Sequence, residues 1–336
     1  MIDKRIPYTD LDRLLDRLAK RGAVYAPIKD EAGEVVLAAR THDQPIVLEY
    51  RNFRLSPKAL VLPQNQTLMC FKNGDVEEPA LSDRETFLFG VRPCDARAML
   101  ALDKVFIDGD QHDPYYARLR AKVAVIALAC TRPTSSCFCT SVGSGPGDAA
   151  GADVLAVALD ADLLLGAETP RGQELLSCVA DLLTDAPGAA VKEAEGQIRA
   201  AEDQIAPVNL QNIARRLRDA YDSPLWETAS LKCLGCGTCS YLCPTCHCFD
   251  ITDDVRGGTV RRVRTWDCCA YPLFTLHASG HNPRPTAKER WRQRIMHKFR
   301  YAAENYNHLL CVGCGRCIRN CPVSMDLRTV LKEVGA

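Results

Sequence analysis

Cysteine is the residue type in this sequence whose number and spacing point most directly to chemistry. The chain holds 18 cysteines in 336 residues, and twelve of them lie between residues 233 and 336. Eight of those twelve form a repeat, because the pattern C-x2-C-G-x-C-x3-C-P occurs at residues 233–244 and again at residues 311–322. In a reducing compartment, thiols clustered at short fixed spacings indicate metal or redox chemistry rather than a disulfide framework.

The spacing within each repeat is the one that bacterial ferredoxins use to bind a [4Fe–4S] cluster. Glycines beside the cysteines let the backbone turn tightly around the sulfurs. In two-cluster proteins of this kind, the fourth cysteine of each repeat, which precedes a proline, binds the cluster of the other repeat. The sequence therefore predicts two [4Fe–4S] clusters with crossed ligands, cluster 1 on Cys233, Cys236, Cys239 and Cys321, and cluster 2 on Cys311, Cys314, Cys317 and Cys243.

A pair of zinc sites is a competing interpretation of the same cysteines. Zinc needs four Cys or His ligands in a closed site, but the doubled pattern of eight cysteines with two prolines is more specific than that requirement. The sequence C-P-T-C-H at residues 243–247 also matches a c-type haem attachment motif. Haem attachment would remove Cys243 from the cluster pattern, so we favour two [4Fe–4S] clusters.

Four more cysteines follow apolar runs in the first part of the chain. Cys94 comes after the run at 86–91, Cys130 ends the run at 123–130, and Cys137 and Cys139 follow shortly afterwards. The ends of neighbouring strands in an α/β sheet meet at one edge, so these four cysteines are candidates for a third [4Fe–4S] site. Buried structural cysteines are the alternative, and the spacing alone leaves both interpretations open.

The remaining six cysteines have no motif of their own. Cys246, Cys248, Cys268 and Cys269 are close in sequence to the first repeat, and we expect them either to bind a further metal or to line the cluster pockets. Cys70 and Cys178 are expected to be ordinary core residues.

We find no motif for an organic cofactor. The glycines at 143–147 lack the spacing of a phosphate-binding loop, and the sequence contains no convincing nicotinamide or flavin motif. No residue is therefore assigned to catalysis or to an organic cofactor, and any flavin or nicotinamide is expected on another chain.

Strand and helix patterns alternate in the first two thirds of the chain. Leucines at 11, 14, 15 and 18 predict an amphipathic helix that ends at Gly22. Further helices are expected near 95–106, 172–184, 189–204 and 208–221, and strands at 45–50, 59–62, 86–91, 123–130 and 153–165. These patterns predict the α+β class, with an N-terminal mixed α/β domain over residues 1–222 and a C-terminal α-helical-type dicluster ferredoxin domain over residues 223–336.

The C-terminal part shows few strand patterns. A long helix is expected over 287–304, with Trp291, Ile295 and Phe299 on one face, and a last short helix is expected to start at Ser324. Residues 255–300 are strongly basic. This basic segment is interpreted as a solvated face, as positive charge that stabilises the clusters, or as a docking surface for an acidic partner.

Composition limits the classes of function. The 42 Lys and Arg residues balance 42 Asp and Glu residues, which argues against a nucleic-acid binder that works by net positive charge. No apolar run reaches the roughly 18 residues that a membrane helix needs, and the N-terminal residues show no secretion signal. We therefore expect a cytoplasmic protein with no membrane span and no nucleic-acid partner.

Several motifs stand together in the order found in one protein family. They are L-S-P-K at 55–58, G-V-R-P-C-D-A-R at 90–97, C-F-C at 137–139, C-P-T-C-H-C at 243–248, W-D-C-C at 266–269 and the last cysteine quartet. Over nearly its whole length the chain resembles the iron–sulfur (beta) subunit of soluble NAD(P)-linked [NiFe] hydrogenases, also called sulfhydrogenases. It is also similar to the A subunit of anaerobic sulfite reductase.

This resemblance implies an electron relay. A flavin subunit would exchange a hydride with NAD(P)H and pass single electrons to this chain, which would conduct them to a catalytic subunit, or in reverse. The resemblance favours the third cluster, and it includes Cys246, Cys248 and Cys269 in the family pattern without giving their role. Cys268 departs from the pattern, because a small residue other than cysteine is expected there, so Cys268 is the least expected ligand of this group.

The sequence therefore predicts a non-catalytic iron–sulfur electron-transfer subunit of a cytoplasmic multisubunit oxidoreductase. A [NiFe] hydrogenase is the first choice of catalytic partner, ahead of a sirohaem sulfite reductase and a heterodisulfide-reductase-type complex. A free-standing polyferredoxin carrier is the alternative from another class, and an N-terminal part of more than 200 residues argues against it.

Overall fold

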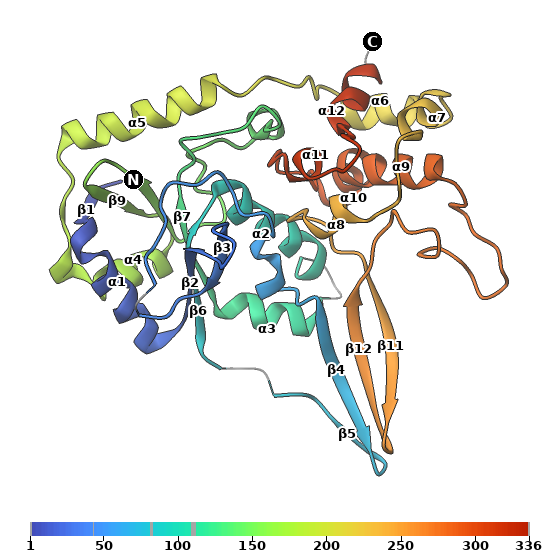
Figure 1. The fold of residues 1–336 in the computed structure, drawn as a ribbon, viewed down its shortest axis with the longest axis horizontal. Coiled ribbons are helices and arrows are strands. Elements are labelled where there is room, and N and C mark those ends of the chain that lie inside the picture. The colour runs from blue at the N-terminus through green and yellow to red at the C-terminus, as the bar shows by residue number, and fades with distance from the viewer. Residues whose placement is uncertain (1, 43, 81–82, 109–111, 335–336) are drawn as a thin grey trace.

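The computed structural model describes residues 2–42, 44–80, 83–108 and 112–334. A mixed sheet of eight strands forms the centre of the N-terminal part (Figure 1). Its strands β2, β6, β7 and β8 run parallel, and the outer strands pair antiparallel. The order across the sheet is β10 (Thr184–Asp185), β1 (Lys4–Pro7), β9 (Asp162–Ala167), β8 (Val154–Ala158), β7 (Val123–Leu128), β6 (Glu85–Val91), β2 (Gly22–Lys29) and β3 (Val35–Ala39).

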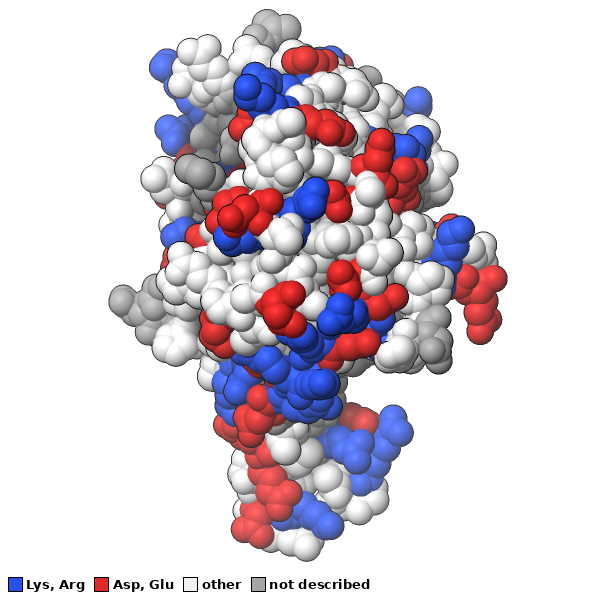
Figure 2. All heavy atoms as spheres, turned by 90° about the vertical axis from the view of Figure 1, so that its left-hand side faces the viewer, with Lys and Arg blue, Asp and Glu red and all other residues white. Residues whose placement is uncertain are grey.

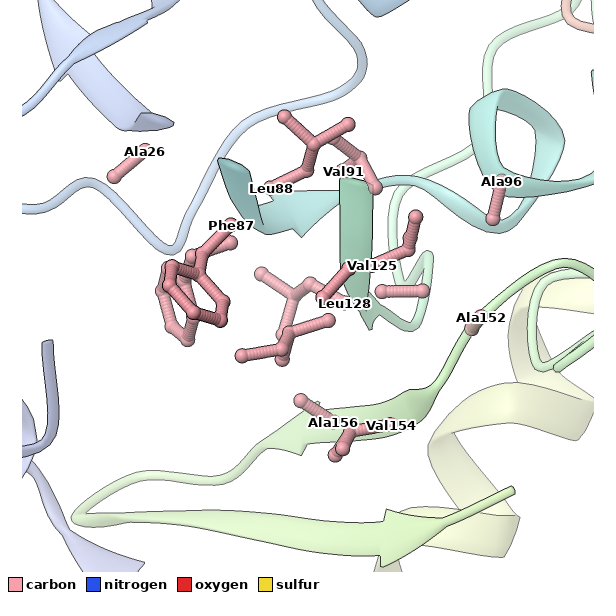
Figure 3. Packing of buried hydrophobic residues seen from close by; sticks show 14 of the residues in the cluster. Ala26, Phe87, Leu88, Val91, Ala96, Val125, Leu128, Ala152, Val154 and Ala156 are labelled. Atoms are coloured by element: carbon pink, nitrogen blue, oxygen red, sulfur yellow. The ribbon is translucent and has the colours of Figure 1, made fainter. Parts of the chain in front are cut away.

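The parallel centre of this sheet is buried, as its apolar sequence requires. Every residue of β7 is buried, and so are the last five residues of β6. Continuous apolar runs of this kind are typical of parallel strands covered on both faces. Figure 3 shows side chains of the core around these strands, among them Phe87, Val125 and Val154. The strands predicted at 86–91 and 123–130 are therefore confirmed.

Five helices accompany the large sheet. They are α1 (Tyr8–Arg21), α2 (Pro93–Phe106), α3 (Pro114–Lys122), α4 (Pro170–Ser177) and α5 (Gly188–Asp203). The four leucines that predicted the first helix are all buried, and the helix ends at Gly22 as expected. Short 3-10 turns occur at Pro57–Leu60, Cys139–Val142 and Ala180–Leu182. The mixed α and β content predicted for this part is confirmed.

Two of the predicted strands are wrong. The run at 45–50 forms no strand and the run at 59–62 lies at the short turn Pro57–Leu60. Apolar residues in both runs still reach the core, because Tyr50 stacks on Phe53 with ring centroids 4.7 Å apart and Val61 is fully buried. Burial without a strand partner therefore explains their apolar sequence.

A second sheet forms an arm that projects from the body (Figure 1). It consists of β4 (Asn65–Lys72), β5 (Asp75–Glu77), β11 (Phe249–Arg256) and β12 (Thr259–Trp266), and β12 pairs with β4. No strand was predicted after residue 223, and β11 and β12 lie there. The division of the chain at residue 222 stays a prediction, and one sheet takes strands from both sides of it.

The arm was missed because its strands carry charge rather than a buried apolar face. Arg262 pairs with Asp253 across the hairpin at 2.9 Å, and six of the eight residues of β11 are exposed. Gly257 and Gly258 have φ angles of 53° and 79°. Positive φ at both central residues is what a two-residue hairpin turn requires, so this glycine pair is the sequence signal for the arm.

The C-terminal helices surround a second core. They are α6 (Ile213–Asp219), α7 (Leu225–Ser230), α9 (Ala287–Met296) and α12 (Leu327–Glu333), and a π-helical turn at His297–Tyr301 joins α9 to α10 (Ala302–Tyr306). The long helix predicted over 287–304 is therefore confirmed. Its residues Trp291, Ile295 and Phe299 are buried as expected, and so are the apolar residues of α12.

The surface carries both signs of charge. On the face shown in Figure 2, acidic and basic side chains are interspersed over the body and along the arm. No helix among the described residues is both long and apolar enough to cross a membrane.

Candidate metal centres

The two cysteine repeats have the same local structure. In each repeat two glycines take positive φ angles, 66° and 76° at Gly235 and Gly237, and 61° and 71° at Gly313 and Gly315. A short helix follows each pair, α8 (Thr238–Tyr241) in the first repeat and α11 (Arg316–Arg319) in the second. L side chains are disfavoured at such φ angles, which explains the glycines between the cysteines. Because α8 and α11 contact each other, the two repeats lie side by side.

The first site combines cysteines from both repeats. A cavity is lined by all four residues predicted for cluster 1: Cys233, Cys236, Cys239 and Cys321. Cys236 is exposed to solvent. The hydroxyl of Thr238, 3.4 Å from its sulfur, lowers the pKa of Cys236. The structure therefore brings these four side chains together at a cavity near the surface.

The second site is buried. Electrostatic interactions join Cys243 to the other three cysteines predicted for cluster 2: Cys311, Cys314 and Cys317. Burial raises the pKa of Cys311 to about 12. The sulfur of Cys243 lies 3.2 Å from both Lys298 Nζ and Thr245 Oγ1. A hydrogen bond from the Cys246 thiol, together with the charge of Lys298, lowers the pKa of Cys243 despite its burial.

The third site lies at the edge of the large sheet. Cys94 is the second residue of α2, shortly after β6, and Cys130 follows β7, the next strand in the sheet. A second cavity is lined by the four predicted residues Cys94, Cys130, Cys137 and Cys139. Parallel strands end at the same edge of a sheet, which is why these distant cysteines meet. Burial raises the pKa of the Cys94 thiol well above its ordinary value and that of Cys139 to about 12.

The three sites are adjacent. Cys317 of the second site also lines the cavity of the first, and Cys314 of the second site also lines the cavity of the third. The backbone N–H of Phe138 donates to the carbonyl of Gly313 at 2.9 Å. A Cβ atom on Gly313 would overlap the backbone of Cys139. The second repeat is therefore packed directly against the third site.

Buried cations lie against the first and second sites. The guanidinium of Arg294 donates to the carbonyl of Cys239 at 2.8 Å and to Ser240 Oγ at 3.0 Å. Lys298 donates to Cys243 Sγ and to Thr245 Oγ1. The two cations are 3% and 4% exposed, and within the described residues neither pairs with a carboxylate. Burial alone would lower the pKa of Lys298, but the sulfurs of Cys243 and Cys246 raise it above its ordinary value.

The third site has its own buried cations. Arg316 pairs with Asp95 at 2.7 Å, and neither side chain is exposed. Arg316 Nη1 and Asp95 Oδ1 have no hydrogen-bond partner in the described part of the chain. Arg92 lines the cavity and donates to the backbone carbonyls of Arg51 and Ala129 at 2.8 and 2.6 Å. Carbonyl oxygens carry no net charge, so Arg92 lacks a counter-ion among these partners.

This arrangement fits iron–sulfur clusters. Burying a cation without a counter-ion is costly, and a cubane core held by four thiolates would supply negative charge at each site. The described residues contain no group of three His, Cys, Asp or Glu side chains arranged to hold a single metal ion. In a cubane each thiolate binds a different iron, so the cysteines surround a cavity instead of converging on one point.

The other cysteines differ in environment. Cys246, Cys248, Cys268 and Cys269 lie beside the first and second sites, and Cys268 and Cys269 are buried. Cys70 is half-buried in β4. Cys178 is exposed after α4, so the prediction of a core role is wrong for Cys178. In α4, which ends just before Cys178, the buried apolar side chain is that of Leu175.

Sequence reasoning anticipated positive charge near the clusters but not which residues supply it. The basic segment 255–300 contains Arg294 and Lys298, on the helix that also carries Trp291. Lys58, Arg92 and Arg316 were missed as buried cations. Their signal was their place inside the motifs at 55–58, 90–97 and 311–322, where a charged residue stands beside the cysteines or prolines.

Comparison with known proteins identifies both the domain and the family. Residues 232–325 match the family model described as a 4Fe-4S dicluster domain. This match confirms the prediction of a [4Fe–4S] domain in the C-terminal part, while the number of clusters and their individual ligands stay predictions.

A relative extends the similarity to the whole chain. The protein named sulfhydrogenase 2 subunit beta, from Pyrococcus furiosus, is 32% identical over 324 residues, which cover 95% of this chain and 94% of the relative. The similarity therefore includes the third site and the arm as well as the dicluster domain. Identity at this level over almost the full length of both proteins shows that this chain belongs to the family of sulfhydrogenase beta subunits.

Proposed function

We propose that this chain is the iron–sulfur electron-transfer subunit of a hydrogenase-type oxidoreductase complex in the cytoplasm. It would relay single electrons between an NAD(P)H–flavin subunit and a catalytic subunit, with a [NiFe] hydrogenase as the first choice. Family membership and the dicluster domain support this function. The cytoplasm is favoured because thiols held for metal binding persist in a reducing compartment.

We propose three [4Fe–4S] clusters, held by the residues predicted from sequence. Cys233, Cys236, Cys239 and Cys321 would hold the first, Cys243, Cys311, Cys314 and Cys317 the second, and Cys94, Cys130, Cys137 and Cys139 the third. One-electron transfer is the chemistry that such clusters supply when bound, with potentials set by charge, burial and hydrogen bonds to sulfur.

The observation that carries the proposal is the contiguity of the three sites. Cys317 is shared by the walls of the second site and the first cavity, and Cys314 by those of the second site and the third cavity. This sharing supports a series in which the second site lies between the other two. The protein residues line the sites and supply buried cations, which would stabilise negative charge there.

Contact with partner subunits is proposed near the first site. Leu231, two residues before the first repeat, and Leu234, directly after Cys233 within it, are 79% and 67% exposed. Leu234 also lines the cavity of the first site. Exposed leucines beside a redox site favour a subunit with a fixed partner over a freely diffusing carrier, and the exposed Cys236 gives that partner a short path to the site.

A reduction experiment tests the relay and the expected place of the flavin together. The chain is purified anaerobically, alone and in its native complex, and its visible absorbance is followed during reduction. Dithionite should bleach both samples, whereas NAD(P)H should bleach only the complex, because the flavin is proposed to belong to another subunit. Bleaching of the isolated chain by NAD(P)H would contradict that assignment, and a colourless chain would contradict the clusters.

A further inference from the structure

Four cysteines outside the three sites meet at the root of the arm. Cys246 and Cys248 come just before β11, and Cys268 and Cys269 come just after β12 (Figure 1). The hairpin holds the two segments together, since the backbone N–H of Asp267 donates to the carbonyl of Cys248 at 2.9 Å. Strand pairing therefore brings together two pairs of cysteines that are about twenty residues apart in sequence.

The sulfurs of these residues form one connected group. Cys269 interacts electrostatically with Cys248 and Cys268, and Cys246 interacts electrostatically with Cys248. The hydroxyl of Ser240 lies 3.9 Å from Cys269 Sγ. Cys268 is 0% exposed and Cys269 is 8% exposed. Four cysteines are the number that an iron–sulfur cluster with only thiolate ligands needs.

Two buried cations connect Ser240 to Cys246. Arg294 Nη1 lies 3.0 Å from Ser240 Oγ and 3.4 Å from Cys246 Sγ. Lys58 Nζ donates to the carbonyl oxygens of Ser240 and Cys246 at 3.2 and 2.9 Å, and it lies 4.0 Å above the ring of Trp266. Both cations are therefore held against this group of cysteines by direct hydrogen bonds.

The sulfurs that act on Lys58 belong to Cys246 and Cys248 at the root of the arm and to Cys243 of the second site. Lys58 is 4% exposed, and no carboxylate of the described residues pairs with it. Its two side-chain hydrogen bonds reach neutral carbonyl groups, one of them on Cys246. A buried ammonium group needs a nearby negative charge, and the closest unassigned sulfurs are those at the root of the arm.

We propose that Cys246, Cys248, Cys268 and Cys269 bind a fourth iron–sulfur cluster at the root of the arm. Thiolate ligands would supply the negative charge that Lys58 lacks and would tie β11 to β12. Cys239 of the first site interacts with Cys269, and Cys243 of the second site with Cys246, so this cluster would lie beside both. The inference rests on the iron–sulfur loading proposed above but not on the identity of any partner.

Iron analysis of the anaerobically purified native complex tests this inference. With four [4Fe–4S] clusters the chain should contain about 16 irons and as many acid-labile sulfides, and with three about 12. The double variant Cys248→Ser/Cys269→Ser should lose about four irons per chain and one signal from the electron paramagnetic resonance spectrum of the reduced protein. Cys70→Ser, a half-buried thiol change in β4 of the same arm, is the matched control and should lose none.

The outcomes separate this inference from the proposed function. Wild-type protein with about 12 irons, unchanged in the double variant, would overturn the fourth cluster and leave the relay intact. Zinc in place of iron at these cysteines would also overturn it. If the double variant fails to assemble, Cys268→Ser supplies the second test, and an iron content equal to that of the wild type would contradict Cys268 as a ligand.

Discussion

The first and second cysteine sites share one motif but differ in their surroundings. The first site has an exposed cysteine, Cys236, beside exposed leucines, and a threonine hydroxyl is near the sulfur. In the second site the sulfur of Cys243 faces a threonine hydroxyl and also the buried ammonium group of Lys298. The two sites therefore have the same motif of proposed ligands, while the neighbouring residues decide the local charge and the access of solvent. We interpret the first site as a place of electron exchange and the second as an internal relay.

The backbone of the first repeat also has more space around it than the backbone of the second repeat. A Cβ atom on Gly313, in the second repeat, would overlap the backbone of Cys139, whereas one on Gly235, at the equivalent position of the first repeat, would lie 3.2 Å from the carbonyl of Ala270. The second repeat is thus locked against the third site, and the first has more room. This difference gives matched pairs of substitutions that separate an internal site from a surface site.

The largest effect is expected from removing a ligand of the internal site. Cys314→Ser should disrupt the second cluster and lower electron transfer through the complex by more than the about 10–100-fold that loss of an outer-shell contact causes. The measurement is NAD(P)H-dependent activity of the catalytic subunit, with iron content determined in parallel. Cys70→Ser is the control for thiol removal. Full activity in Cys314→Ser would show that the second site is not on the electron path.

The second-largest effect is expected on stability, when a side chain is added at the equivalent glycines Gly235 and Gly313. Gly235→Ala should cost about 1–3 kcal/mol of stability, because alanine is strained at positive φ. Gly313→Ala should cost more, since its Cβ atom also overlaps Cys139, and it should release iron from the third site. Thermal unfolding of the two variants and iron analysis provide the comparison. Equal stability losses would contradict the tight packing of the second repeat against the third site.

A smaller effect is expected from the buried ammonium group of the second site. Lys298→Met removes a positive charge 3.2 Å from Cys243 Sγ and should lower the reduction potential of the second cluster by on the order of 100 mV, with the first much less affected. Redox titration followed by electron paramagnetic resonance measures both. Lys288→Met, which removes the same charge from the same helix but from an exposed pair with Glu227, is the control. A shift of equal size in the control would refute the specific role of Lys298.

The smallest effects are expected from the two threonine hydroxyls. Thr245→Val should lower the potential of the second cluster and disturb Lys298, because the hydroxyl contacts Cys243 Sγ at 3.2 Å and accepts from Lys298 Nζ at 3.0 Å. Thr238→Val removes a 3.4 Å contact at the exposed Cys236 and should shift the potential of the first cluster less. The same titration compares them, and a larger shift in Thr238→Val would reverse our ranking of the two sites.

The sequence predicted those helices and strands whose own residues show a periodic or continuous apolar pattern. The leucines of α1, the apolar runs of β6 and β7 and the amphipathic face of α9 each encode their own burial. The arm was not predicted, because charged pairs such as Arg262 and Asp253 stabilise its exposed strands. The two strand predictions that are wrong, at 45–50 and 59–62, mistook burial of a loop for burial of a strand.

For the candidate sites too, local spacing could be predicted and long-range contacts could not. Motif spacing alone predicted the crossed sets of the first two sites, whose cysteines the structure brings together. The third set was left open by spacing, because its cysteines meet only through the order of β6 and β7 in the sheet. The buried cations could not be assigned from sequence, since Lys58 reaches Cys246 across 188 positions of the chain. The motifs at 55–58, 90–97 and 311–322 mark these residues, but they do not encode the long-range contacts that bury them.

Anaerobic affinity purification of the chain from its native host tests the central claim most directly. Mass spectrometry would identify the proteins that co-purify in stoichiometric amount. Our account predicts an NAD(P)H–flavin subunit together with a catalytic subunit, such as a [NiFe] hydrogenase, in one brown complex. A chain that elutes alone, brown and monomeric, would contradict the relay and favour a free-standing electron carrier.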